Sequence, residues 1–90
     1  MIRFPLGHVV ATPGALRAFE KAEHLPAECL DRHVHGDWGD VTDADKQENE
    51  VSIEQGFRML SAYTTSAGDR IWVLTEADRS ATMILLPEEY

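Results

Sequence analysis

The sequence predicts a single-domain α+β protein with the element order β-α-α-α-β-β-β. A three- or four-stranded antiparallel sheet is expected, with helices packed on one face. Three observations lead to this prediction. The chain of 90 residues has the length of one domain, 1–90. Segments with helical periodicity and helix caps fill its first half. Short segments rich in apolar residues, separated by turn residues, fill its last third.

The first strand and the first helix follow directly from local signals. Residues 6–11 contain the run His-Val-Val-Ala and are expected to form a short strand. Thr12 and Pro13 are typical of a helix start, because threonine caps the free N–H groups and proline suits the first helical position. Leu16 and Phe19 fall at helical spacing and are expected to face the core.

Two further helices are expected before the remaining strands. The second runs from about Pro26 to His35. The third is opened by Thr42 as its cap and ended by Gly56, and its first turn is acidic, which suits the helix dipole. The residues expected to face inward are, in the second helix, Leu25, Cys29, Leu30 and Val34 and, in the third, Val41, Ala44, Val51 and Ile53.

The last three strands are predicted at residues 57–65, 71–74 and 81–86. Because short turns join them, they are expected to form an antiparallel meander. The segment 71–74, Ile-Trp-Val-Leu, is apolar on both faces and is expected to be central. The helices are expected to cover the face that carries the side chains of Trp72, Leu74, Ile84 and Leu86. The sequence leaves open whether the first strand joins this sheet.

Charge and cysteine content limit the possible functions. Sixteen Asp and Glu against eight Lys and Arg give a net charge of −8. This charge disfavours direct nucleic-acid binding and suits a protein partner with a basic surface, although acidity also serves solubility alone. A single cysteine allows no internal disulfide, which favours a reducing, cytoplasmic environment. Neither a signal peptide nor a membrane span is predicted, and no cofactor is expected.

A candidate interaction surface is predicted from acidic residues around one tryptophan and from the six-residue turn 75–80. Trp38 is either an exposed anchor for a partner or a residue that folds back to seal the core. The second interpretation is favoured, because a small domain needs the large apolar area of a tryptophan side chain in its core. A metal site at the neighbouring acids is disfavoured, because their spacing does not match a calcium loop. The candidate residues are Asp37, Trp38, Asp40, Asp43, Asp45, Glu48, Glu50, Glu76, Asp78 and Arg79.

A second hypothesis rests on one cysteine and two histidines. Cys29 and His33 are four residues apart, on one face of the second helix, and His35 follows. Such residues can bind zinc or form a nucleophile and base pair. A paired cysteine motif is missing, and a cysteine on an apolar helix face is most often a small buried hydrophobe. A metal-binding protein or an enzyme built on these residues is therefore the alternative rather than the main hypothesis.

Five stretches together carry a resemblance to known proteins: LGHVVATPGAL (6–16), HVHGDWGD (33–40), DKQENE (45–50), IWVLTEADRSAT (71–82) and LLPEEY (85–90). Through them the chain resembles a family of short bacterial proteins labelled plasmid-related, and the resemblance covers nearly its whole length. It implies carriage on plasmids, phages and integrated elements, a context in which small acidic proteins often inhibit host defence. It implies no activity, so no catalytic residue is carried over.

The main functional hypothesis is a non-enzymatic module that binds another protein through its acidic surface. A sharper form makes it a counter-defence inhibitor, of the anti-restriction or anti-CRISPR kind, whose carboxylates stand in for phosphates. The third hypothesis is an oligomeric accessory protein or antitoxin-like regulator, and a homo-oligomer is compatible with either view. This third hypothesis lacks a basic DNA-reading helix in the sequence.

Overall fold

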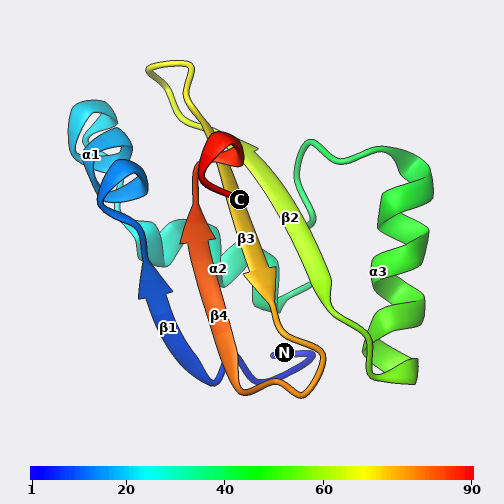
Figure 1. Ribbon diagram of the computed structural model, residues 1–90. Helices are drawn as coiled ribbons and strands as arrows, with labels where there is room; N and C mark the ends of the chain where they lie inside the picture. Colours follow the sequence, from blue (N-terminus) through cyan, green and yellow to red (C-terminus); the bar gives the residue numbers. More distant parts are fainter.

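The computed structural model describes all 90 residues and confirms the predicted α+β class and element order. The four strands form one sheet, and Figure 1 shows them side by side with the helices behind and beside them. The 3-10 turn after the last strand lies in front of the sheet, together with the C-terminus. The elements are β1 (His8–Ala11), α1 (Pro13–Ala22), α2 (Pro26–Val34), α3 (Asp43–Gln55), β2 (Met59–Thr64), β3 (Arg70–Thr75), β4 (Ala81–Leu85) and the 3-10 turn Pro87–Glu89.

The sheet is mixed, with strand order β1-β4-β3-β2. The pairs β2–β3 and β3–β4 are antiparallel, as the short turns predict. β1 joins as the fourth strand and runs parallel to β4, with His8 opposite Ala81. The expectation of a wholly antiparallel sheet is therefore wrong for this one strand. Three helices separate β1 from the next strand along the chain, so no tight turn dictates its direction.

The helices α1 and α2 pack against one face of the sheet. Phe19 of α1 and Cys29 of α2 contact the main core cluster, to which the strands contribute Ile71, Val73 and Ile84. Trp72 and Leu74 alternate with these strand residues and therefore point to the opposite face. The predicted set is therefore divided: Ile84 lies under α1 and α2 and Leu86 packs against the same core cluster, whereas Trp72 and Leu74 lie on the opposite face, where the prediction is wrong.

The inner faces of α1 and α2 differ in part from the predicted ones. Phe19 is buried, but Leu16 is 48% exposed, and the small residues Ala15 and Ala18 face the sheet instead. Small side chains let the helix approach the strands closely, whereas Leu16 would hold it away. In α2, the predicted Leu25 is exposed as well.

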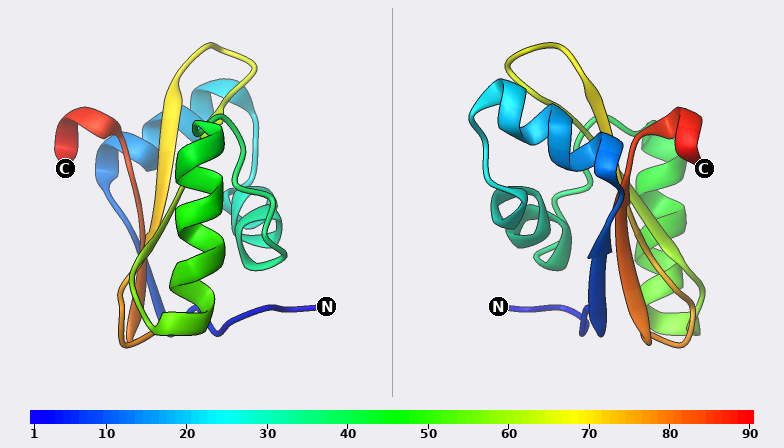
Figure 2. Two further views of the ribbon diagram at one scale, coloured as in Figure 1. Left: turned by 90° about the vertical axis from the view of Figure 1, so that its right-hand side faces the viewer. Right: turned by 60° about the vertical axis from the view of Figure 1, so that its left-hand side comes forward.

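The third helix does not cover the sheet but runs along the edge strand β2 (Figure 2). Its buried residues are Asn49 and Ser52, whereas the predicted inward residues Ala44 and Val51 are exposed. The other two predicted inward residues, Val41 and Ile53, are half-buried. A strand edge presents N–H and C=O groups, so the helix face against it carries polar side chains rather than apolar ones.

Side chains and loop backbone occupy the free edge of β2. The Asn49 amide donates to the Leu60 carbonyl at 2.9 Å and accepts from the Leu60 N–H at 3.1 Å. The next outward residue, Ala62, donates to the Trp38 carbonyl at 3.1 Å and accepts from the Asp40 N–H at 2.7 Å. The backbone groups of Leu60 and Ala62 that point away from β3 are therefore paired within the chain.

We expect the amides of residues 71–74 to be among the slowest to exchange with deuterium. β3 lies between two strands, so its amides are released only when the sheet opens. Native-state hydrogen exchange measured by NMR tests this expectation. Exchange of these amides as fast as that of the terminal residues would contradict the central placement of the strand.

Replacing Asn49 with Ala should lower the free energy of unfolding by about 1–3 kcal/mol, because it leaves the N–H and C=O of Leu60 without partners. Urea denaturation followed by circular dichroism measures the change. Gln47→Ala is the matched control, since Gln47 is an exposed amide residue of the same helix. Equal stabilities of the two variants would show that the Asn49 contact does not hold the edge.

Candidate functional site: a groove between the third helix and the sheet

Trp38 is a core residue. Its ring is 4% exposed, stacks on Phe4 at 6.1 Å between centroids, and meets His33 edge-on at 5.7 Å. The indole N–H donates to the Glu50 carboxylate at 3.0 Å, which satisfies its one polar atom. The fold-back interpretation is therefore correct, and Trp38 is not a surface anchor.

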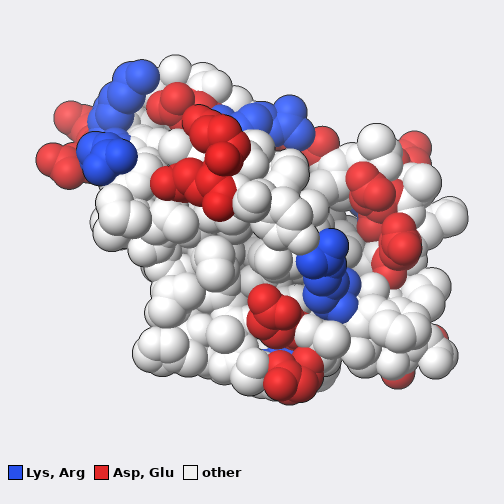
Figure 3. Space-filling model, viewed as in Figure 1, with Lys and Arg blue, Asp and Glu red and all other residues white.

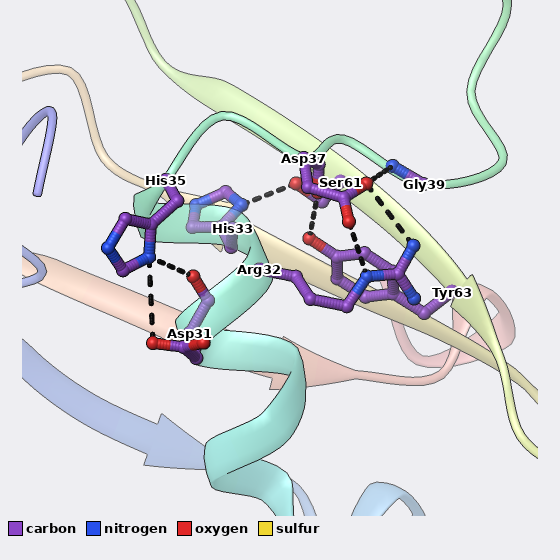
Figure 4. A network of polar contacts seen from close by, with 8 residues as sticks. All are labelled: Asp31, Arg32, His33, His35, Asp37, Gly39, Ser61 and Tyr63. Carbon is purple, nitrogen blue, oxygen red and sulfur yellow. Dashed lines mark hydrogen bonds and ion pairs between the residues drawn. The ribbon is translucent and has the colours of Figure 1, made fainter. Parts of the chain in front are cut away.

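Two of the predicted surface acids are held in bidentate pairs with arginines. Arg32 donates to both carboxylate oxygens of Asp37, at 2.7 and 3.2 Å (Figure 4), and Arg3 donates to both oxygens of Glu50, at 2.9 and 2.7 Å. These hydrogen bonds lower the pKa of both carboxyl groups. Their charges are neutralised locally, so Asp37 and Glu50 support the fold around Trp38 rather than a free acidic surface.

Arg79 also has a structural role. It takes a left-handed backbone conformation in the β3–β4 turn, with φ of 62°. Its guanidinium donates to the carbonyls of Phe57 at 2.8 Å and Ala77 at 2.9 Å, and to that of Ser52, in the last turn of α3, at 2.9 Å. The arginine thus ties the turn to the end of α3, where helix carbonyls lack partners within the helix. Sequence reasoning did not find this role.

The remaining predicted acids are exposed but lie in different places. Asp43, Asp45 and Glu48 are on α3 and take part in none of the ion pairs. Asp40, in the preceding loop, accepts from the Thr64 hydroxyl at 2.9 Å. The other two, Glu76 and Asp78, lie in the β3–β4 turn. The structure therefore does not gather the predicted surface into one patch.

His33 forms the centre of a buried polar chain. Its Nδ1 lies 2.5 Å from the Ser61 hydroxyl and its Nε2 lies 2.8 Å from that of Thr75. Thr75 is 2.8 Å from Thr82, whose hydroxyl donates to the Leu6 carbonyl at 2.7 Å. Each hydroxyl has one proton, so Thr82 accepts from Thr75, and Thr75 accepts from Nε2–H. Burial keeps the imidazole neutral, so its proton is on Nε2 and Nδ1 accepts from the Ser61 hydroxyl.

The three residues of the metal or enzyme hypothesis are not brought together. Both nitrogens of His33 are engaged with hydroxyls, and burial lowers its pKa to about 4. Burial raises the pKa of the Cys29 thiol to about 11, which disfavours the reactive thiolate. His35 lies on the other side of the helix, where its Nδ1 is 2.6 Å from the Asp31 carbonyl (Figure 4). No three His, Cys, Asp or Glu side chains lie close enough to share a metal ion.

A groove of about 450 Å³ lies between α3 and the face of the sheet that α1 and α2 leave uncovered. Leu60, Trp72 and Leu74 form its apolar floor, and Trp72 packs edge-on against Tyr90 at 5.7 Å. Two aromatic side chains form its rim, since Phe57 is 58% and Tyr90 63% exposed. Exposed aromatic residues around a concave apolar surface are typical of a binding site.

The polar lining of the groove is divided by charge. Asp45 and Glu48 line it from α3, and both are exposed. Arg58 lines it near the C-terminus, where its guanidinium donates to the Tyr90 hydroxyl at 2.6 Å. A ligand with an apolar side chain beside a cation fits this arrangement. Sequence analysis found the acids but missed the groove, because its aromatic residues lie at least 15 positions apart along the chain.

Comparison with models of protein families, with curated proteins and with solved structures finds no match for this chain. None of its helices has the length and apolar character needed to cross a bilayer. The geometry of the groove and the charge around it therefore carry the functional argument.

We expect acidification from pH 6.5 to pH 4 to destabilise the protein by about 3 kcal/mol through His33 alone. The pKa of this imidazole is lowered in the fold, so the unfolded chain binds the proton first and stability falls across this interval. The ion pairs of Asp37 and Glu50 with arginines contribute to the pH dependence of stability at lower pH. Their stabilising effect is lost only as the two carboxylates become protonated. Urea denaturation at a series of pH values measures the effect.

The control for this pH effect is His33→Gln, which removes the titrating group. The variant should be less stable at neutral pH, but its stability should change little between pH 6.5 and pH 4.5. If the wild-type protein shows the same flat profile, the buried neutral imidazole is not the acid-sensitive element.

Proposed function

We propose that this protein is a non-enzymatic interaction module that binds a basic protein partner at the groove between α3 and the sheet. The observation that carries the proposal is the combination of an exposed aromatic rim with unpaired carboxylates beside it. Phe57 and Tyr90 provide apolar contact area, and Asp45 and Glu48 provide negative charge. The expected ligand is a segment with an aromatic or aliphatic side chain flanked by Lys or Arg.

The two features of the groove contribute in different ways. Burial of the aromatic rim and of Trp72 supplies most of the binding free energy, as aromatic anchors do at protein interfaces. The carboxylates mainly increase the rate of association and select a basic partner. The net charge of −8 also attracts a basic partner over a longer distance.

Continuous mimicry of a nucleic-acid backbone is less well supported than this local groove. A phosphate mimic needs a row of carboxylates, but the acidic residues on the face with the groove form separate groups with Lys or Arg between them (Figure 3). The counter-defence hypothesis remains compatible with the proposal in one form. In that form, the groove binds a basic segment of a host enzyme and does not replace its nucleic acid.

The test is affinity capture from a bacterial lysate with three immobilised proteins. They are the wild-type chain, the groove variant Phe57→Ser/Glu48→Lys, and the control Leu25→Ser/Glu28→Lys. The control likewise replaces one exposed apolar residue by Ser and one exposed Glu by Lys, at the N-cap and in the first turn of α2, away from the groove. A partner should bind the wild type and the control but lose at least about tenfold in affinity for the groove variant.

Titration of the captured partner with salt completes this test. Affinity should fall as salt rises from low concentration to about 0.5 M, because the carboxylates are exposed and therefore screened. A partner that binds the groove variant as tightly as the wild type would contradict the proposed site. If the partner loses affinity for the groove variant but its binding is insensitive to salt, the groove remains the binding site. The proposal that the ligand is basic is then wrong.

A further inference from the structure

The two edge strands of the sheet differ in whether other parts of the chain pair with their outward backbone groups. At β2, the backbone groups of Leu60 and Ala62 that point away from the sheet are paired with Asn49 and with the loop before α3. At β1, the other edge, no further strand follows (Figure 1), and the right-hand view of Figure 2 shows this strand at the open border of the sheet. Open edges are the usual sites at which a strand from another chain is added.

The backbone groups available at β1 follow from its pairing with β4. The N–H of His8 donates to the Ser80 carbonyl and that of Thr12 to the Ile84 carbonyl, both at 2.9 Å. In a parallel pair, every second residue directs both its N–H and its C=O group to the neighbouring strand. The backbone groups of His8 and Val10 therefore point to β4. The N–H and C=O groups of Val9 and Ala11 therefore point away from β4, at the edge where no further strand follows.

We infer that β1 pairs antiparallel with β1 of a second copy of this chain and joins two sheets into one of eight strands. A two-fold axis at Val10 places Val9 opposite Ala11 of the other copy, and each such pair exchanges two hydrogen bonds. Val10 then faces its own counterpart in a close, non-hydrogen-bonded pair. The edge is thus complementary to itself over the length of the strand.

Charge and side chains favour a second copy over a basic partner at this edge. The strand His8–Ala11 has no acidic residue, although the chain as a whole carries a charge of −8. Val9 and Val10 are 39% and 38% exposed, and Met83 beside Val10 is also exposed on the sheet. A strand with apolar side chains, outward backbone groups and no acidic residue of its own offers little attraction to a basic protein, but it matches an identical strand.

This interface responds to salt in the opposite direction from the proposed groove. Each copy brings a charge of −8, so their mutual repulsion opposes pairing, and salt weakens that repulsion. Dimerisation through β1 should therefore strengthen as salt rises, whereas binding of a basic partner should weaken. The groove lies beside β2, at the other edge of the sheet, so the two proposals fail independently.

Sedimentation equilibrium over chain concentrations up to about 1 mM, at low and at 0.5 M salt, tests the inference, since an interface of this size is weak. The wild-type chain should dimerise, and more so at high salt. Val10→Lys should reduce dimerisation at least about tenfold, because it places like charges directly opposite each other. Val51→Lys is the control, since it makes the same substitution at an exposed residue of α3, beside the opposite edge of the sheet.

A backbone variant separates strand pairing from other contacts. Val9→Pro removes the outward N–H of the edge and leaves the bonds to β4 in place, as proline is tolerated on edge strands. It should abolish dimerisation while its circular dichroism and unfolding midpoint stay close to those of the wild type. A wild-type chain that remains monomeric up to about 1 mM in 0.5 M salt overturns the inference. A dimer that persists in folded Val9→Pro or Val10→Lys also overturns it.

Discussion

The packing of this protein depends on one buried imidazole that stays neutral. His33 reaches from α2 to the sheet, where hydroxyls on β2, β3 and β4 form a chain that ends at the Leu6 carbonyl. Burial of polar atoms is costly unless each has a partner, so these groups stabilise the fold only when all are correctly placed. Thr75 and Thr82 are register partners, and a shift of one residue would turn the hydroxyls to the opposite face. The chain of hydrogen bonds therefore links strand register to the position of α2.

The same histidine organises the segments that lead to α3. Phe4 and Trp38 pack around its ring, and Glu50 joins Trp38 to Arg3 near the N-terminus. The loop that contains Trp38 then runs along β2 and closes part of its edge. Residues that the sequence suggested as a recognition surface thus connect the buried core to the edge of the sheet.

The groove exists because α3 is bound to the edge of the sheet by polar contacts. Asn49 and Arg79 hold this helix beside β2, and its sequence has no continuous apolar face that would pack over Trp72. The outer face of the sheet therefore stays open between α3 and the C-terminal turn. One set of contacts accounts both for the closed edge at β2 and for the open apolar surface beside it.

The sequence by itself determined the features that depend on neighbouring residues. Thr12 and Thr42 accept hydrogen bonds from the third residue after them, as helix caps do, and Gly56 ends α3 with a left-handed backbone. Residues 71–74 form an inner strand, and the fold class and element order are as predicted. These signals are local, since each acts within a few residues and does not depend on the rest of the fold.

Only the tertiary structure decided the direction of β1, the burial of His33, the role of Asn49 and the existence of the groove. Each of these results from groups far apart in the sequence, such as His33 and Thr75, which are 42 positions apart. A histidine on a helix gives no local sign that hydroxyls on two strands will bond to its ring, and an asparagine gives none that a strand edge will lie beside it. For the same reason the acids of the predicted surface were recognised from the sequence but their separation into structural pairs and free carboxylates was not. Charge is a property of composition, whereas the partner of each charge is set by long-range packing.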